Sequence, residues 1–158
     1  SRGLGDVYKR QDIYLPDLKY YSGELSQKYS EVKNYFEIAS EAIKEMCKQV
    51  GKSEFNDNGI MQKGIIIRHL VLPNHIQNTK HVLKWIKENL PEDTYVSVMA
   101  QYFPTYKARE DNLLNRKLTK KEYKEIEDYL YMLDIENGYI QELGDHEEEY
   151  VPDFNGKF

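Results

Sequence analysis

The chain has 158 residues, of which 40% are hydrophobic and 31% are charged, and its formal net charge is −5. This composition suits one globular domain with a hydrophobic core and excludes an intrinsically disordered chain. The negative charge argues against a nucleic-acid-binding surface, which would carry a basic stripe. The sequence has no apolar run long enough to cross a membrane. We therefore expect a cytoplasmic protein with no nucleic-acid or membrane partner.

The two ends of the sequence differ from its middle. Residues 1–11 show little apolar pattern and resemble the translated end of a sequencing adapter, although a natural loop is the alternative. We expect this segment to be non-native or disordered. The domain would then cover residues 12–144, with residues 145–158 as its acidic C-terminal tail.

The first part of the domain predicts a strand and then a helix. Ile13–Leu15 is a short apolar run that stops at Pro16, as short strands often do. From about Glu31 to Val50, apolar residues recur every three or four positions, which predicts an amphipathic helix. Cys47, the single cysteine, lies on this apolar stripe, and we interpret it as a packing residue.

Two further strand–helix units follow. Gly64–Pro73 is the strongest predicted strand, and its consecutive β-branched residues indicate burial on both faces. A helix starts near Asn78 or Thr79 and ends before Pro91. The remaining signals are a strand at Tyr95–Ala100, a helix whose capping box is Thr119 with Glu122, and a short segment at Tyr139–Gln141.

The order β-α-β-α-β-α predicts an α/β protein with a parallel sheet. Right-handed crossovers would place the three helices on one side of that sheet. The result would be either half of an open sheet or an arc of a barrel.

Candidate functional residues fall near the C-terminal ends of the predicted strands, where parallel α/β proteins place their sites. Asp17 and Lys19 follow the first strand, Arg68 and His69 interrupt the second, and Gln101 follows the third. A guanidinium within a strand needs an anionic partner, from the protein or from a ligand.

Neighbouring residues in a strand point to opposite faces. We expect Arg68 to face the barrel interior and His69 to make a structural hydrogen bond beneath the helices. Asp17 and Lys19 are two residues apart, so they share a face. Their spacing fits a plain salt bridge as well as a ligand site.

Several ordered segments resemble a subgroup of radical S-adenosylmethionine (SAM) proteins that is homologous to the pyruvate formate-lyase activating enzymes. The resemblance covers nearly everything from Asp12 to Phe154, and the segments that carry it are Ile13–Tyr21, Gly64–Pro73, Met99–Pro104, Leu118–Tyr123 and Tyr150–Phe154. It implies the C-terminal half of a partial (β/α)6 TIM-like barrel, made of three βα units with parallel strands.

The resemblance also implies an oxidoreductase activity and its cofactors. In such enzymes a 4Fe-4S cluster on three closely spaced cysteines cleaves SAM reductively to a 5′-deoxyadenosyl radical. In the activating enzymes this radical abstracts hydrogen from a glycine of a partner protein. One cysteine cannot hold the cluster. We therefore expect this chain to lack activity alone and to self-associate through an open barrel edge.

The resemblance assigns roles to four residues. Asp17 resembles the acidic residue near the SAM carboxylate and its monovalent cation, and Lys19 and Arg68 resemble basic groups that hold SAM. Gln101 stands where better-known activating enzymes carry a histidine beside the SAM ribose. Two alternatives remain, namely a Schiff-base aldolase that uses Lys19 and a non-catalytic interaction module suggested by 14 tyrosines and the acidic tail.

Overall fold

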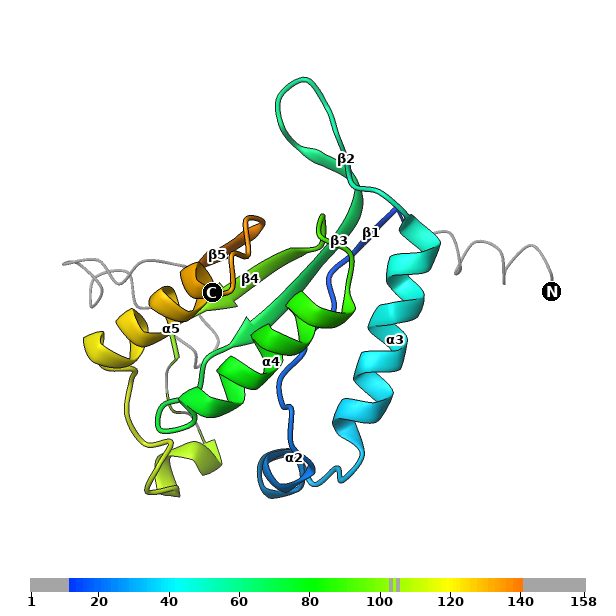
Figure 1. Ribbon diagram of the computed structural model, residues 1–158. Coiled ribbons are helices and arrows are strands. Elements are labelled where there is room, and N and C mark those ends of the chain that lie inside the picture. The colour runs from blue at the N-terminus through cyan, green and yellow to red at the C-terminus, as the bar shows by residue number, and fades with distance from the viewer. Residues whose placement is uncertain (1–11, 103, 105, 141–158) are drawn as a thin grey trace.

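The computed structural model describes residues 12–102, 104 and 106–140. Its sheet contains four parallel strands in the order β1-β3-β4-β5, and a short strand β2 pairs antiparallel with the start of β3 (Figure 1). The strands are β1 (Ile13–Tyr14), β2 (Glu54–Phe55), β3 (Met61–Leu70), β4 (Tyr95–Met99) and β5 (Gly138–Ile140). The helices are α2 (Gly23–Ser30), α3 (Tyr35–Val50), α4 (Ile76–Asn89), the 3-10 helix η1 (Tyr106–Glu110) and α5 (Lys120–Met132). The predicted α/β class with a parallel sheet is confirmed.

The helices cover one face of the sheet. Along β3, Ile65, Ile67 and His69 are buried, whereas Arg68 is exposed. The buried positions of β3 and β4 form one core with side chains of α3, α4 and α5, and Figure 1 shows α4 crossing in front of the sheet. The prediction that β3 is buried on both faces is therefore wrong for the described residues, in which helices cover one face and the other is half-buried or exposed. We call the other face the open face.

The chain between Tyr21 and Val50 folds as two helices instead of one. Ser22 caps α2 by accepting a hydrogen bond from Leu25 N at 3.2 Å, and Glu31 ends the helix with φ at +57°. Helix α3 then begins at Tyr35, not at Glu31. Sequence periodicity missed α2 because its eight residues carry too few apolar side chains to form a stripe.

Other helix and strand boundaries differ from the predicted ones for local reasons. Helix α4 begins at Ile76, before the predicted start. Its N-cap is His75, whose side chain makes no capping hydrogen bond, so the sequence carries no capping signal at the true start. Strands β2 and β5 are too short to show a period, and β5 brings the number of parallel strands to four, where three were predicted. The capping box of α5 is confirmed, with Thr119 and Glu122 each bonded to the other's backbone at 3.0 Å.

Three expectations concern other features of the chain. The assignments of residues 1–11 and 145–158 lie outside the described residues. Cys47 packs, half-buried, against the core, and burial raises the pKa of its thiol. In the part of the chain that the structure describes, every helix is too short or too polar to cross a membrane.

Candidate functional site

Asp17 and Arg68 form an ion pair on the open face. The backbone after β1 stays beside β3, because Arg68 N donates to Pro16 O at 2.8 Å and Leu18 N donates to Arg68 O at 2.9 Å. This register places Asp17 opposite Arg68, whose Nε donates to Asp17 Oδ1 at 2.8 Å. The prediction that Arg68 needs an anionic partner is thus met by a carboxylate from the neighbouring strand.

The Arg68–Asp17 pair retains unused binding capacity. The two side chains are 44% and 39% exposed, so the guanidinium lies at an accessible surface. Within residues 12–102, 104 and 106–140, no other hydrogen bond involves the Arg68 side chain, which leaves both Nη groups available. Guanidinium groups use these paired donors to bind carboxylate or phosphate.

Lys19 lies in the same extended segment. Burial alternates here, with Leu18 and Tyr20 in the core and Asp17 and Lys19 exposed. Across the described residues the Lys19 ammonium has no ion-pair partner, so the simple Asp17–Lys19 salt bridge that the spacing allowed is not formed. An exposed lysine also lacks the apolar surroundings that a Schiff-base lysine requires.

The backbone around Lys19 is fixed by side chains of two helices. Lys19 N donates to Tyr35 Oη at 2.9 Å. The carboxamide of Asn78 donates to Lys19 O at 2.9 Å and accepts from Tyr21 N at 2.8 Å. Asn78 is buried in the first turns of α4. The segment that carries Asp17 and Lys19 is therefore held in one conformation.

Gln101 lies apart from the charged residues. It follows β4 at a tight turn in which Tyr102 N donates to Ala100 O at 3.0 Å, and it is half-exposed. In the described part of the chain, no hydrogen bond joins its carboxamide to Asp17 or Arg68. Its neighbour Tyr102 is structural, because its hydroxyl donates to Leu114 O at 2.9 Å and burial raises its pKa to about 12.

His69 has the structural role that was predicted for it. Its ring is completely buried, and Nδ1 must donate to Leu18 O at 2.7 Å because a carbonyl oxygen only accepts. Nε2 then accepts from the Thr79 hydroxyl at 2.8 Å. Burial lowers the His69 pKa to about 4, although the hydrogen bond to Leu18 opposes that shift. His69 is therefore neutral at pH 7 and joins the segment after β1 to β3 and α4.

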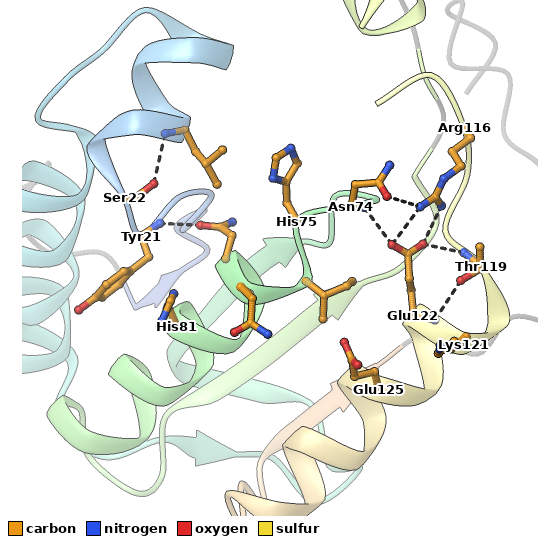
Figure 2. Close-up of a pocket in the computed structure, with 14 residues that line it drawn as sticks. Tyr21, Ser22, Asn74, His75, His81, Arg116, Thr119, Lys121, Glu122 and Glu125 are labelled. Carbon is orange, nitrogen blue, oxygen red and sulfur yellow. Dashed lines mark hydrogen bonds and ion pairs between the residues drawn. The ribbon is translucent and has the colours of Figure 1, made fainter. Parts of the chain in front are cut away.

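A cavity of about 560 Å³ lies on the opposite, helical side, where α2, α4 and α5 begin. None of the four candidate residues lines it. Figure 2 shows one wall made by Arg116, Asn74 and Glu122 and the other by Tyr21 and Ser22. Sequence analysis missed this cavity, because the capping box identified Glu122 only as a helix cap.

The wall at α5 is an ion pair with several supporting hydrogen bonds. Arg116 Nη1 and Nη2 donate to the two carboxylate oxygens of Glu122 at 2.7 and 3.2 Å. Asn74 N also donates to Glu122, at 2.9 Å, and the Asn74 side chain accepts from Arg116 at 2.8 Å. Burial alone would raise the Glu122 pKa, but these hydrogen bonds outweigh it and lower the pKa to about 2.

The opposite wall is formed by the segment that carries Tyr21 and Ser22, and the Tyr21 ring packs against Phe36 with a centroid separation of 4.8 Å. Tyr21 stacks on His81 with a centroid separation of 5.1 Å and an interplanar angle of 28°. His75 also lines the cavity, and its Nε2 lies 2.7 Å from the hydroxyl of Tyr29. Burial lowers the pKa of His75, as does the nearby Lys28 ammonium, while Asp111 opposes this shift. Both walls are thus fixed by contacts that exist without a ligand.

The sequence also suggested a monovalent cation at Asp17 and, as an alternative function, an interaction module built on tyrosines. Among the described residues, no three His, Cys, Asp or Glu side chains are grouped as a metal site would require. Several tyrosines are core or half-buried packing residues, which gives little support to an interaction module built on them; examples are Tyr14, Tyr20, Tyr35, Tyr102, Tyr123 and Tyr129.

The chain is similar to an uncharacterized protein of Methanocaldococcus jannaschii, with 38% identity over 127 residues. This similarity covers 80% of the chain but only 32% of the archaeal protein. The chain therefore spans about a third of the length of this relative. No protein-family model matches the sequence, and no solved structure matches it.

Proposed function

We propose that this chain is the C-terminal part of a radical SAM enzyme similar to the pyruvate formate-lyase activating enzymes, in which it holds the aminoacyl end of SAM. The observation that carries the proposal is the ion pair between Arg68 and Asp17 on the open face, in which the Nη groups of Arg68 make no hydrogen bond to any described residue. A ligand carboxylate would accept from these donors and from the Lys19 ammonium. Asp17 would accept from the ligand's ammonium group or bind a monovalent cation beside it.

The topology supports a barrel, which forms the second part of the proposal. The parallel strands follow one another in chain order, without the reversal that marks a doubly wound sheet. The open face carries apolar side chains, with Ile13 and Leu15 exposed by 39% and 55% and Ile66 and Leu70 half-buried. Such a face is covered in larger proteins. We propose that further βα units close a partial (β/α)6 barrel over it.

The residues of this chain fit SAM better than they fit the iron–sulfur cluster. Their two cations and one carboxylate complement the carboxylate and ammonium of an amino acid. The cluster does not fit, because Cys47 is the single thiol of the sequence and packs on the helical side of the sheet. Cluster thiolates would have to come from another part of the longer protein. SAM, when bound, would supply the precursor of the radical.

Calorimetry with two ligands tests the assignment of Arg68 and Lys19. The ligands are SAM and 5′-methylthioadenosine, which retains the nucleoside but lacks the aminoacyl carboxylate. We expect Arg68→Ala and Lys19→Ala each to weaken SAM binding at least tenfold, since a charge-assisted hydrogen bond is worth about 1.5–3 kcal/mol. Binding of 5′-methylthioadenosine should not change.

Lys84→Ala is the matched control, because this exposed lysine lies on α4, away from the open face. Equal SAM affinity in all three variants would contradict the proposal. An in-frame group of closely spaced cysteine codons upstream of Asp12 in the gene would support the radical SAM class. A complete gene without such a motif would contradict it.

The open face also predicts how the isolated chain behaves. Among the described strands, β1 and β5 are the two edges of the parallel sheet, and unpaired edges promote association. We expect the chain alone to be marginally stable and oligomeric, as measured by sedimentation velocity and thermal unfolding. A monomer with a sharp unfolding transition would count against the barrel.

A further inference from the structure

The segment between β1 and α2 carries two of the candidate residues, but the sheet holds only its first part. Figure 1 shows this segment running between α3 and α4. Its last backbone hydrogen bond to β3 runs from Leu18 N to Arg68 O, at 2.9 Å. Among the described residues, no backbone–backbone hydrogen bond involves Lys19, Tyr20 or Tyr21. Side chains must therefore fix the path of the chain beyond Leu18.

Tyr35 of α3 bridges the two residues that carry the candidate charges. Its hydroxyl accepts from Lys19 N at 2.9 Å and donates to Asp17 O at 3.1 Å. Burial raises the Tyr35 pKa, although the hydrogen bond with Lys19 opposes this shift, so the hydroxyl keeps the proton that the second bond needs. The ring packs against the core and contacts the Tyr20 ring with a centroid separation of 5.4 Å. A fixed ring thus sets the backbone of Asp17 relative to that of Lys19.

Asn78 of α4 fixes the other side of Lys19. This side chain is 5% exposed, and both ends of its carboxamide are bonded to the segment. His69 of β3 holds Leu18 O in the same stretch. Side chains from three elements therefore bond five backbone groups of residues 17–21. The fold in this way fixes the backbone beneath two exposed side chains that make few contacts of their own.

We propose that Tyr35 and Asn78 are positioning residues of the open-face site, which hold Asp17 and Lys19 in the arrangement that the carboxylate and ammonium of a ligand require. The inference rests on the proposed function, because it concerns the same aminoacyl site. Both residues act through the backbone of Lys19. A segment that is already ordered loses less conformational freedom when a ligand binds. Without the Tyr35 hydroxyl, a smaller fraction of the chain has the binding conformation, and the apparent affinity falls by that fraction.

Two variants that each lose one tyrosine hydroxyl test this role by calorimetry on the full chain. Tyr35→Phe removes the bridge and keeps the ring. Tyr20→Phe is the matched control, because within the described residues its hydroxyl bonds the Ser30 side chain, at 2.9 Å, and not the backbone of the segment. We expect Tyr35→Phe to weaken SAM binding about fivefold, the scale of one lost hydrogen bond, and Tyr20→Phe to leave it unchanged. Binding of 5′-methylthioadenosine should be the same in both variants, because it lacks the aminoacyl group.

NMR provides a signature that a general loss of stability would not produce. In the 15N-labelled chain, the Lys19 amide should shift and exchange with water several-fold faster in Tyr35→Phe than in Tyr20→Phe.

A second pair of variants tests the contribution of α4. Asn78→Ala should weaken SAM binding about tenfold, because it removes both bonds around Lys19. Asn89→Ala is its control, because Asn89 lies on the same helix and bonds Trp85 O. Thermal unfolding of each variant verifies that it folds, and the Tyr35 pair decides the question if Asn78→Ala does not.

The outcomes separate this inference from the proposed function. Equal SAM affinity in Tyr35→Phe and Tyr20→Phe, with SAM bound by the unsubstituted chain, would overturn the inference and leave the proposed function standing. Equal losses for SAM and 5′-methylthioadenosine in Tyr35→Phe would make Tyr35 a structural residue only. An unsubstituted chain that does not bind SAM would overturn the proposed function, and the inference with it.

Discussion

The two faces of the sheet are built from the same strands but differ in burial and in the kind of side chain they carry. On the covered face, Ile67 and Val96 are completely buried and pack against three helices. On the open face, the same strand presents Arg68, whose side chain is 44% exposed and ion-paired. The side chains of the covered face therefore contribute most of the free energy of folding. The alternating side chains of the open face are available to bind a ligand. Each prediction below compares substitutions on these faces or in the contacts that support them.

The largest effect is expected from matched isoleucines on opposite faces. Ile67→Ala removes a fully buried side chain and should lower the free energy of unfolding by about 3–4 kcal/mol. Ile66→Ala, on the half-buried open face, should cost about 1 kcal/mol or less. Urea unfolding of both variants measures the difference. Equal costs would show that the isolated chain covers its open face, for example by self-association.

His69 should make the covered face sensitive to acid. The pKa of His69 is about 4 in the folded chain, below its ordinary value of 6.5, so the unfolded chain binds more protons between these values. Stability is then fully present above pH 6.5 and falls on the order of 2–3 kcal/mol as the pH drops to 4.

Urea unfolding across this pH range measures the loss for the parent and for His69→Gln, which should lose most of the slope. His75→Gln is the control, because burial lowers the His75 pKa as well but that ring is only half-buried. An NMR titration of the parent provides a second measurement that needs no variant. A His69 ring that titrates near pH 6.5 would contradict the burial argument.

Glu122 should stabilise the chain at higher pH by a smaller amount. Glu122→Gln removes the charge that Arg116 and the backbone of Asn74 bind, and we expect a cost of about 1–2 kcal/mol at pH 7. The folded pKa of about 2 lies below the ordinary value of 4.5, so this contribution is present above pH 4.5 and is lost as the pH falls toward 2.

Glu127→Gln serves as the control, because Glu127 is exposed and lies 3.9 Å from Lys124. It should change stability by less than about 0.5 kcal/mol. Chemical unfolding at pH 7 and pH 3 separates the two variants. A cost for Glu122→Gln that does not depend on pH would point to lost packing and away from charge.

The smallest effect on stability is expected at Arg68. Its ion pair with Asp17 is accessible to water at both partners, and such pairs contribute about 0–1 kcal/mol. Arg68→Ala should therefore leave the unfolding midpoint almost unchanged. A loss comparable to that of Ile67→Ala would make Arg68 a structural residue and would weaken its assignment to ligand binding.

The sequence predicted the main frame of the fold from strong local signals. The apolar run of β3 and the capping box of α5 located both elements within a few residues, although the burial on both faces that the run of isoleucines predicted is not found. The opposite orientations of Arg68 and His69 were also predicted, because side chains alternate in any strand.

What the sequence did not predict depends on contacts between distant segments. The pairing of Asp17 with Arg68 joins residues 51 positions apart, and the bonds of Asn78 to Lys19 and Tyr21 join residues more than 50 apart. Neither has a local pattern. Strand β5 has only three residues, so its parallel pairing with β4 follows from the position of α5 and not from its own composition.

The two hydrogen bonds of the Asn78 carboxamide have a consequence for the design of chimeric proteins. Residues 17–22 take their shape from a carboxamide carried by α4, so this loop and the first turns of that helix form one transplantable unit. A chimera that receives the loop without the asparagine would inherit the residues but not their arrangement. Grafts should therefore carry both pieces together.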